Sequence, residues 1–336
     1  MRIPVARNGR VLIAALLVSY ALTGCGGASA DADSSRQAQR KPPISVAEAT
    51  DIVRRYDEAN NAANARYDTA ALHQIETSPA VVTSEARLVQ AKALRQTVEQ
   101  VTHPPRQVVI PRTIGYPRWF VVLAPVVKSG AATPRAKYLL FVQDAAKGPW
   151  RVAYYPYPSD DSVAAALDVS PDGGAPPVTD ARGLAADPAQ LNQAIYDHYE
   201  STGDGSVRLA PTVALEQQLT NGFRLGQQQM KARGVTFVRK FVQTTYPSYL
   251  IRVADGGVLA FTAGAVLDTL TAATPGGQVT LDPNTPEAAM LGKPDGAHAR
   301  TFTMDRLQMF LSYIPPAGAA AAVQLLAYDD AVLAVR

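Results

Sequence analysis

The feature that most constrains the fold of this 336-residue chain is its single cysteine, Cys25. With one cysteine, no disulfide within the chain can hold any part of the fold together. Small extracellular domains that bury too little apolar surface usually depend on such bonds. Roughly 310 residues follow Cys25, and a chain of that length can bury a sufficient core without covalent bridges. We therefore expect the fold to depend on hydrophobic cores, which suits a hydrophobic content of 47%.

Cys25 stands at the end of a segment that has the order of an export signal. The chain starts with three positive side chains, those of Arg2, Arg7 and Arg10. An uncharged apolar stretch, Val11–Leu22, follows, and two small residues, Thr23 and Gly24, precede the cysteine. This order is typical of a secretory signal. The apolar stretch is shorter than the roughly 20 residues that cross a bilayer. We therefore predict that residues 1–24 are a signal peptide and are removed.

The run Leu22-Thr23-Gly24-Cys25 resembles the lipobox of bacterial lipoproteins. The resemblance implies that the Cys25 thiol carries a diacylglycerol and becomes the first residue after cleavage. Two acyl chains anchor far more firmly than one, because each buried methylene contributes about 0.8 kcal/mol. The expected location is the outer face of the cytoplasmic membrane, with the membrane as a partner through this lipid. The alternative is an ordinary secretory signal in which Cys25 stands by chance.

Charge argues against a nucleic-acid partner. The chain has 32 Lys and Arg against 29 Asp and Glu, a formal net charge of +3. The three arginines of the predicted signal account for this excess, so the chain after residue 24 has no net charge. Binding to nucleic acid requires a basic face, and the sequence has no cluster of basic residues with interleaved aromatics. We expect no nucleic-acid partner.

Composition and periodicity divide the remainder into a tether, two domains and a linker. Residues 25–43 are small and polar, as in a disordered tether. Residues 44–160 and 187–336 each show helical periodicity followed by strand-forming segments, among them Gly257–Thr271 and Val323–Val335. Residues 161–186 are rich in Pro and Gly and indicate a linker. Helices first and strands afterwards predict an α+β fold with two domains, each with N-terminal helices packed on an antiparallel sheet.

This order of elements resembles the NTF2-like, or cystatin-like, fold, in which a curved antiparallel sheet wraps helices around an apolar pocket. The resemblance implies tandem domains of this type. Enzymes of the class, such as steroid isomerases and polyketide cyclases, use an Asp or His as base with a Tyr or second acid. Residues that could fill these roles are Tyr56, Tyr67, Asp68, His73, Tyr196, Asp197, His198 and Tyr199. The whole chain is also similar to uncharacterised lipoproteins of high-GC Gram-positive bacteria, which implies no activity.

The sequence contains no catalytic or cofactor motif. It has no GxSxG, no phosphate loop and no dinucleotide fingerprint. Its four histidines are isolated and have no metal-ligand spacing: they are His73, His103, His198 and His298. We expect no metal, no cofactor and no enzymatic activity. Each histidine is expected to be solvated or satisfied, with His103 in a loop before Pro104-Pro105.

Aromatic and arginine side chains gather between residues 116 and 157. Five of them are candidate contacts for a ligand or partner: Tyr116, Arg118, Trp119, Trp150 and Tyr155. Paired strands can place several rings around one cavity or on one exposed face, and an arginine can orient an anionic group. Core packing is the alternative explanation for these rings.

The sequence therefore predicts a membrane-anchored, non-catalytic protein that binds an unidentified protein or small molecule. A pocket enzyme of the NTF2-like type is the alternative, and a buried Asp or His facing the pocket would favour it. A solute-binding lipoprotein of a transporter is a third reading. Such proteins usually alternate strands and helices, and this chain does not.

Overall fold

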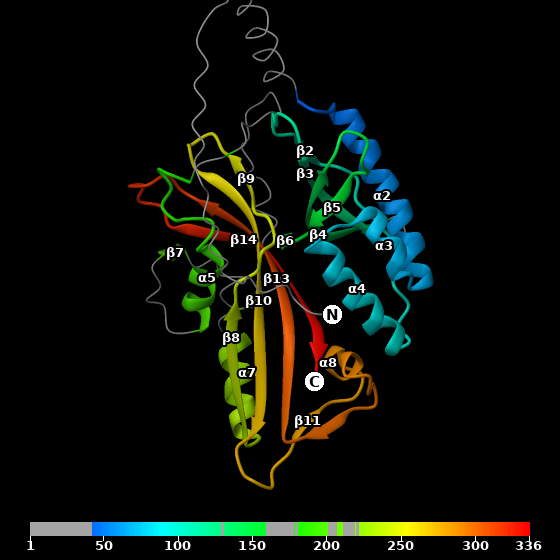
Figure 1. Cartoon of the computed structure of the whole chain (residues 1–336), viewed down its shortest axis with the longest axis vertical. Coiled ribbons are helices and arrows are strands. Elements are labelled where there is room, and N and C mark those ends of the chain that lie inside the picture. The colour runs from blue at the N-terminus through cyan, green and yellow to red at the C-terminus, as the bar shows by residue number, and fades with distance from the viewer. Residues whose placement is uncertain are drawn as a thin grey trace, which may run out of the picture.

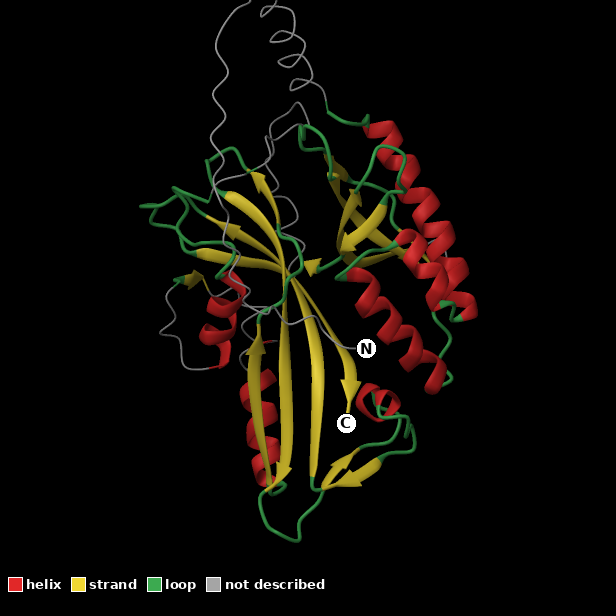
Figure 2. Ribbon diagram, viewed as in Figure 1, coloured by secondary structure: helices red, strands yellow, loops and turns green. Residues whose placement is uncertain are grey.

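The computed structural model describes residues 42–128, 131–158, 178, 181–200, 207–210, 219 and 222–336. Cys25 and the predicted signal peptide lie outside the described residues, as do most of the predicted tether and linker. Figure 1 labels the elements along the chain, and Figure 2 shows helices and strands by colour.

Three helices open the described chain: α2 (Val46–Arg66), α3 (Thr69–Ile75) and α4 (Ala80–Ala93). A capping box starts α2, because the Ser45 side chain accepts from the Glu48 N–H while Glu48 accepts from Ser45. The helix ends at Tyr67, which adopts the left-handed conformation with φ 51°. Apolar residues spaced along one face, including Ile52 and Val53, are buried and pack α2 onto the strands that follow.

Sheet A is built from five antiparallel strands in the first half of the chain. These are β1 (Val101–Thr102), β2 (Gln107–Val109), β3 (Arg118–Lys128), β4 (Ala131–Gln143) and β5 (Arg151–Tyr154). The long β3–β4 hairpin is the centre of the sheet, with Arg118 opposite Gln143 at one end and Lys128 opposite Ala131 at the other. In Figure 1 the three helices lie on one side of this sheet.

Sheet B takes most of its strands from the second half. Its main path is β6 (Tyr157–Pro158), β14 (Val323–Val335), β13 (Thr301–Ile314), β10 (Val258–Ala272) and β8 (Val235–Val242). Two short strands join it, β7 (Leu209–Ala210) on β14 and β9 (Tyr249–Arg252) on β10. Helix α5 (Leu191–Glu200) contacts β10 and β8, and α7 (Gly222–Ala232) packs on β8. The β11 (Val279–Leu281) and β12 (Ala297–Ala299) hairpin and α8 (Pro286–Met290) interrupt the chain between β10 and β13.

The largest hydrophobic core contains side chains from both halves. Trp119 on β3 meets Tyr249 on β9, with ring centroids 5.4 Å apart. The ring centroids of Tyr154 on β5 and Phe261 on β10 are 6.1 Å apart, and the Tyr154 hydroxyl donates to the Pro247 carbonyl at 2.7 Å. Strand β6 comes from the first half of the chain yet pairs with β14 in sheet B. The two sheets therefore share the largest core, while two smaller clusters lie within sheet B and the elements that flank it.

The structure confirms a mixed α+β fold of helices and antiparallel sheets. The expected strands Gly257–Thr271 and Val323–Val335 correspond to β10 and β14. The two-domain NTF2-like arrangement, with boundaries at 44–160 and 187–336, stays a prediction. The last strand of sheet A is β5, and the chain enters sheet B with β6 near Pro158, close to the predicted boundary. The largest hydrophobic core nevertheless includes side chains from both sides of this boundary.

Candidate functional site

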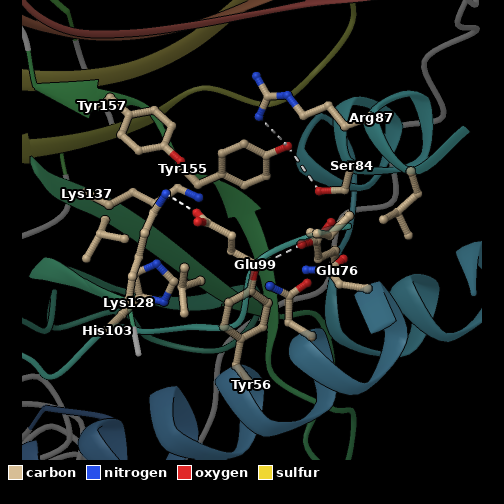
Figure 3. A pocket seen from close by; sticks show the side chains of 16 residues that line it. Tyr56, Glu76, Ser84, Arg87, Glu99, His103, Lys128, Lys137, Tyr155 and Tyr157 are labelled. Carbon is tan, nitrogen blue, oxygen red and sulfur yellow. Dashed lines mark hydrogen bonds and ion pairs between the residues drawn. The ribbon is translucent and has the colours of Figure 1, made fainter. Parts of the chain in front are cut away.

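A cavity of about 520 Å³ lies between α2, α4 and sheet A, and we name it the α2–sheet A cavity. Figure 3 shows its lining side chains. They are Tyr56, Asn60, Asn64, Glu76, Ser84, Arg87, Leu88, Val98, Glu99, Val101, His103, Val126, Lys128, Lys137, Tyr155 and Tyr157. The lining combines tyrosine rings and aliphatic groups with charges of both signs, and a volume of this size is typical of small-molecule sites.

A buried Asp–His pair lies at the wall of this cavity. Asp57 on α2 and His103, which follows β1, are 5% and 2% exposed. Asp57 Oδ1 lies 2.6 Å from His103 Nδ1, and Asp57 Oδ2 accepts from the His103 backbone N–H at 2.7 Å. A carboxylate can only accept, so Nδ1 carries the ring proton and Nε2 is left as an acceptor.

The state of His103 follows from its surroundings. Burial lowers the pKa of His103, an effect that the hydrogen bond to Asp57 opposes and the charge of Lys137 reinforces. The imidazole is therefore neutral at neutral pH. Its Nε2 is buried and has no hydrogen-bond partner in the described part of the chain. Buried polar atoms without partners are rare in folded proteins and call for an explanation.

Glu76 supplies a second acceptor of the same kind. It caps the end of α3 and is 1% exposed. The Tyr56 hydroxyl donates to Glu76 Oε1 at 2.8 Å, while Oε2 is buried without a partner among the described residues. Burial raises the pKa of Glu76, and this effect is opposed by the nearby hydroxyl groups of Ser84 and Tyr56 and by the charge on Lys137. The residues that line the cavity thus include two buried acceptor atoms without a partner among the described residues.

Lys137 on β4 brings a positive charge to the same cavity. Its ammonium lies 4.2 Å from the centroid of the Tyr155 ring and 4.8 Å from that of Tyr157. Cations are attracted to the faces of aromatic rings. The charge of Lys137 is also the main reason why the pKa of Tyr157 is lowered. The ammonium is therefore held over two rings at the cavity wall.

The cavity is connected to sheet B through Arg87 on α4. Tyr155 is buried, and its hydroxyl contacts Thr83, Ser84 at 3.0 Å and Arg87 at 3.4 Å. Arg87 Nη2 also reaches both carboxylate oxygens of Asp329 on β14, at 2.8 and 2.9 Å. A side chain that lines the cavity therefore also joins α4 to β14.

The five residues predicted as contacts do not form one site. Tyr155 lines the cavity, but Trp119 is buried in the shared core against Tyr249. Tyr116, Arg118 and Trp150 lie together at the end of sheet A where β3 begins and β4 ends. The contact prediction remains open for Tyr155 and, at a different place, for these three residues.

The residues considered for NTF2-like chemistry also separate. Tyr56 lines the cavity. The Tyr67 hydroxyl donates to the Gln96 carbonyl. Asp68 caps α3 by accepting from the Ala71 N–H, and His73 is exposed and lies 2.6 Å from Glu85. Three others lie on α5, where Tyr196 donates to the Arg239 carbonyl, Asp197 accepts from Gln193, and His198 is half-buried. The side chain of Tyr199 is outside the described set.

Sequence reasoning missed four residues of the site: Asp57, Glu76, His103 and Lys137. His103 was expected in a loop, and it lies in one, but it is buried and paired there. Asp57 left a signal, because it falls four residues after Val53 on the apolar face of α2, where a carboxylate requires a partner. Glu76 and Lys137 left no such signal, since their burial depends on how α3 and β4 pack.

No group of three or more His, Cys, Asp or Glu side chains within the described ranges is placed to hold a metal ion. In the same residues, no helix is both long and apolar enough to cross a membrane.

Two uncharacterised lipoproteins of Streptomyces coelicolor are similar to this chain. SCO6871 is 27% identical over 269 residues, which cover 74% of each protein. SCO2278 is 26% identical over 275 residues, which cover 79% of this chain and 78% of the relative. No solved structure matches.

A family model described as a domain of unknown function (DUF8094) matches residues 40–336. The chain therefore belongs to this family. The match covers both sheets and the core that they share.

Proposed function

We propose that the protein is a lipoprotein anchored by diacylglycerol on Cys25 at the outer face of the cytoplasmic membrane, and that it binds a small molecule without transforming it. The anchor is supported by the apolar segment before Cys25 and by relatives that are named lipoproteins. The binding role rests on one observation, the two buried acceptors without partners at the α2–sheet A cavity.

The chemistry of the cavity defines the ligand. Glu76 Oε2 and His103 Nε2 need hydrogen-bond donors, such as hydroxyl or amino groups. Lys137 suits a negatively charged group, and the rings of Tyr56, Tyr155 and Tyr157 suit an apolar surface. A small anion that carries hydroxyl or amino groups and has an apolar face satisfies all three requirements.

The anchor is tested by Cys25→Ser. We expect the variant to lose labelling by radioactive or alkyne-tagged fatty acid and to accumulate as precursor or as released protein. Labelling equal to that of the wild type would refute the anchor at Cys25.

The binding role is tested by non-denaturing mass spectrometry of the anchored protein purified from the producing bacterium. The wild type should carry a bound molecule of a few hundred daltons, the size that such a cavity holds. Lys137→Met should lose it, whereas Lys240→Met, a change at an exposed position on β8, should keep it. A wild type without bound molecule, or a Lys137→Met variant that retains it, contradicts the proposal.

A pocket enzyme is the second candidate function, and the Asp57–His103 pair favours it. An aspartate that holds Nδ1–H orients the imidazole so that Nε2 can take a proton. A suitable probe is 5-nitrobenzisoxazole, which loses its ring C–H proton to a base as its N–O bond breaks and yields a nitrile and a phenolate. A catalytic pocket would turn it over at least about 100-fold faster than the His103→Gln variant does. Equal rates would count against His103 as a catalytic base.

A further inference from the structure

One end of sheet A gathers aromatic and basic side chains that the cavity does not use. Because Arg118 on β3 pairs with Gln143 on β4, the segments 111–118 and 144–151 meet at this end, and we name them the sheet A end patch. Ile114 is 66% exposed and Tyr116 is 36% exposed, and Trp150 in the second segment is half-buried. Large apolar groups are thus presented to solvent here.

The charges of the patch are mainly positive. Its sequence includes four basic residues, the exposed Lys147 and the half-buried Arg112, Arg118 and Arg151, against one acidic residue, Asp144. Arg151 pairs with Asp144 at 2.5 Å, and the Arg118 guanidinium lies 4.6 Å from the centre of the Tyr116 ring. Exposed aromatic and aliphatic groups next to basic ones are typical of protein surfaces that lie on anionic lipid.

The position of the patch agrees with the position of the anchor. In Figure 1, α2 begins at the upper end of the molecule, and the β2–β3 connection lies at the same end. Sixteen residues separate Cys25 from Pro42, just before α2. Even when fully extended, they span at most about 55 Å. An anchor at Cys25 therefore limits the distance between the start of α2 and the bilayer to about 55 Å, and it allows the end of the molecule that carries the patch to touch the membrane.

We propose that the sheet A end patch lies on the membrane surface, with Ile114 and Tyr116 inserted among the lipid head groups and the basic side chains facing anionic lipid. The inference rests on the anchoring part of the proposed function and is independent of the cavity. It gives the anchored protein a defined orientation, with the long strands of sheet B pointing away from the bilayer (Figure 1).

The test uses the full-length lipidated protein in vesicles of phosphatidylcholine with phosphatidylglycerol. A lipidated Cys25 has no free thiol, so Ile114→Cys offers one site for an environment-sensitive fluorescent label. The matched control is Leu225→Cys on α7, a 53% exposed apolar position in the lower half of Figure 1. With brominated acyl chains, the label at 114 should lose about half of its emission and that at 225 almost none. Adding Arg118→Gln and Lys147→Gln should reduce the quenching.

The outcomes separate the two proposals. If the protein stays on the vesicles while the label at 114 is no more quenched than the one at 225, the orientation is refuted and the anchor stands. If the protein does not stay on the vesicles, or if the wild type accepts a thiol label at Cys25, the anchor itself fails.

Discussion

The carboxylate of Asp57 decides which nitrogen of His103 carries the proton. It accepts from both the ring and the backbone of His103, so the neutral ring presents an acceptor at Nε2. Glu76 repeats this arrangement, with one oxygen bound by Tyr56 and the other unsatisfied. At the scale of residues, the cavity is defined less by its volume than by these two half-satisfied groups.

The lowered pKa of His103 predicts a dependence of stability on pH. The unfolded chain takes up a proton on this histidine at pH values near 6.5, whereas the folded chain does so only at lower pH. The free energy of unfolding should therefore fall as the pH decreases below about 6.5, until the pKa of the folded state is passed. Urea titrations at several pH values should show this component in the wild type and not in His103→Gln.

The exposed His73 supplies the control for that measurement. His73→Gln should keep the component that His103→Gln lacks. If both variants follow the pH dependence of the wild type, His103 does not titrate differently in the folded and unfolded states.

At the scale of elements, α4 is held between the cavity and the edge region of sheet B. Arg87 and Gln90 on this helix reach Asp329 and the Val332 carbonyl on β14. Asp329 is 5% exposed, and burial raises its pKa, while the charge of Arg87 lowers it. A carboxylate this deeply buried is stabilised by the positive charge of the guanidinium, so the Arg87–Asp329 ion pair fixes the position of α4 against β14.

We expect Arg87→Met to lower the free energy of unfolding by about 3 kcal/mol, because it leaves a buried carboxylate without its partner. Arg54→Met is the matched control, since Arg54 makes its ion pairs with Asp51 and Glu58 on the exposed face of α2. Its cost should be much smaller, because ion pairs between exposed side chains contribute little to stability. Denaturant unfolding measures both.

Adding Asp329→Asn to Arg87→Met should recover part of the loss, because the uncompensated charge is then removed. Equal effects of Arg87→Met and Arg54→Met would show that the contact with β14 does not stabilise α4.

At the scale of the whole molecule, the shared core joins the two sheets into one unit. Trp119 and Tyr154 from sheet A pack on Tyr249 and Phe261 from sheet B, and β6 crosses from one half to the other. The surface that each half would expose alone is the surface that forms this core.

The shared core predicts one cooperative unfolding transition. Both tryptophans, Trp119 and Trp150, lie in the first half, so their fluorescence reports on sheet A. Phe261→Ala on β10 should nevertheless move the fluorescence midpoint, at a cost of about 3–5 kcal/mol. Hydrogen exchange of sheet B amides should follow the same transition. Two separate transitions, with fluorescence unchanged by Phe261→Ala, would instead support two independent domains.

Local pattern was sufficient for most of the elements. The capping residues Ser45 and Glu48 predict the start of α2, and strand-forming composition predicts β10 and β14 to within a residue. Pattern did not predict the candidate site. Asp57 and His103 are 46 residues apart, and Arg87 and Asp329 are 242 apart, so the packing of the whole chain brings them together.

The sequence by itself determined the α+β class and the order of helices and strands. It also predicts that Cys25 anchors the chain. These depend on neighbouring residues, whose periodicity and caps act over one or two turns. Only the tertiary structure decided that the halves share a core, that Trp119 is buried, and that Glu76 and His103 keep unpaired acceptors at a cavity. Burial and pairing depend on which distant segments pack together, and the local spacing of residues does not predict those contacts.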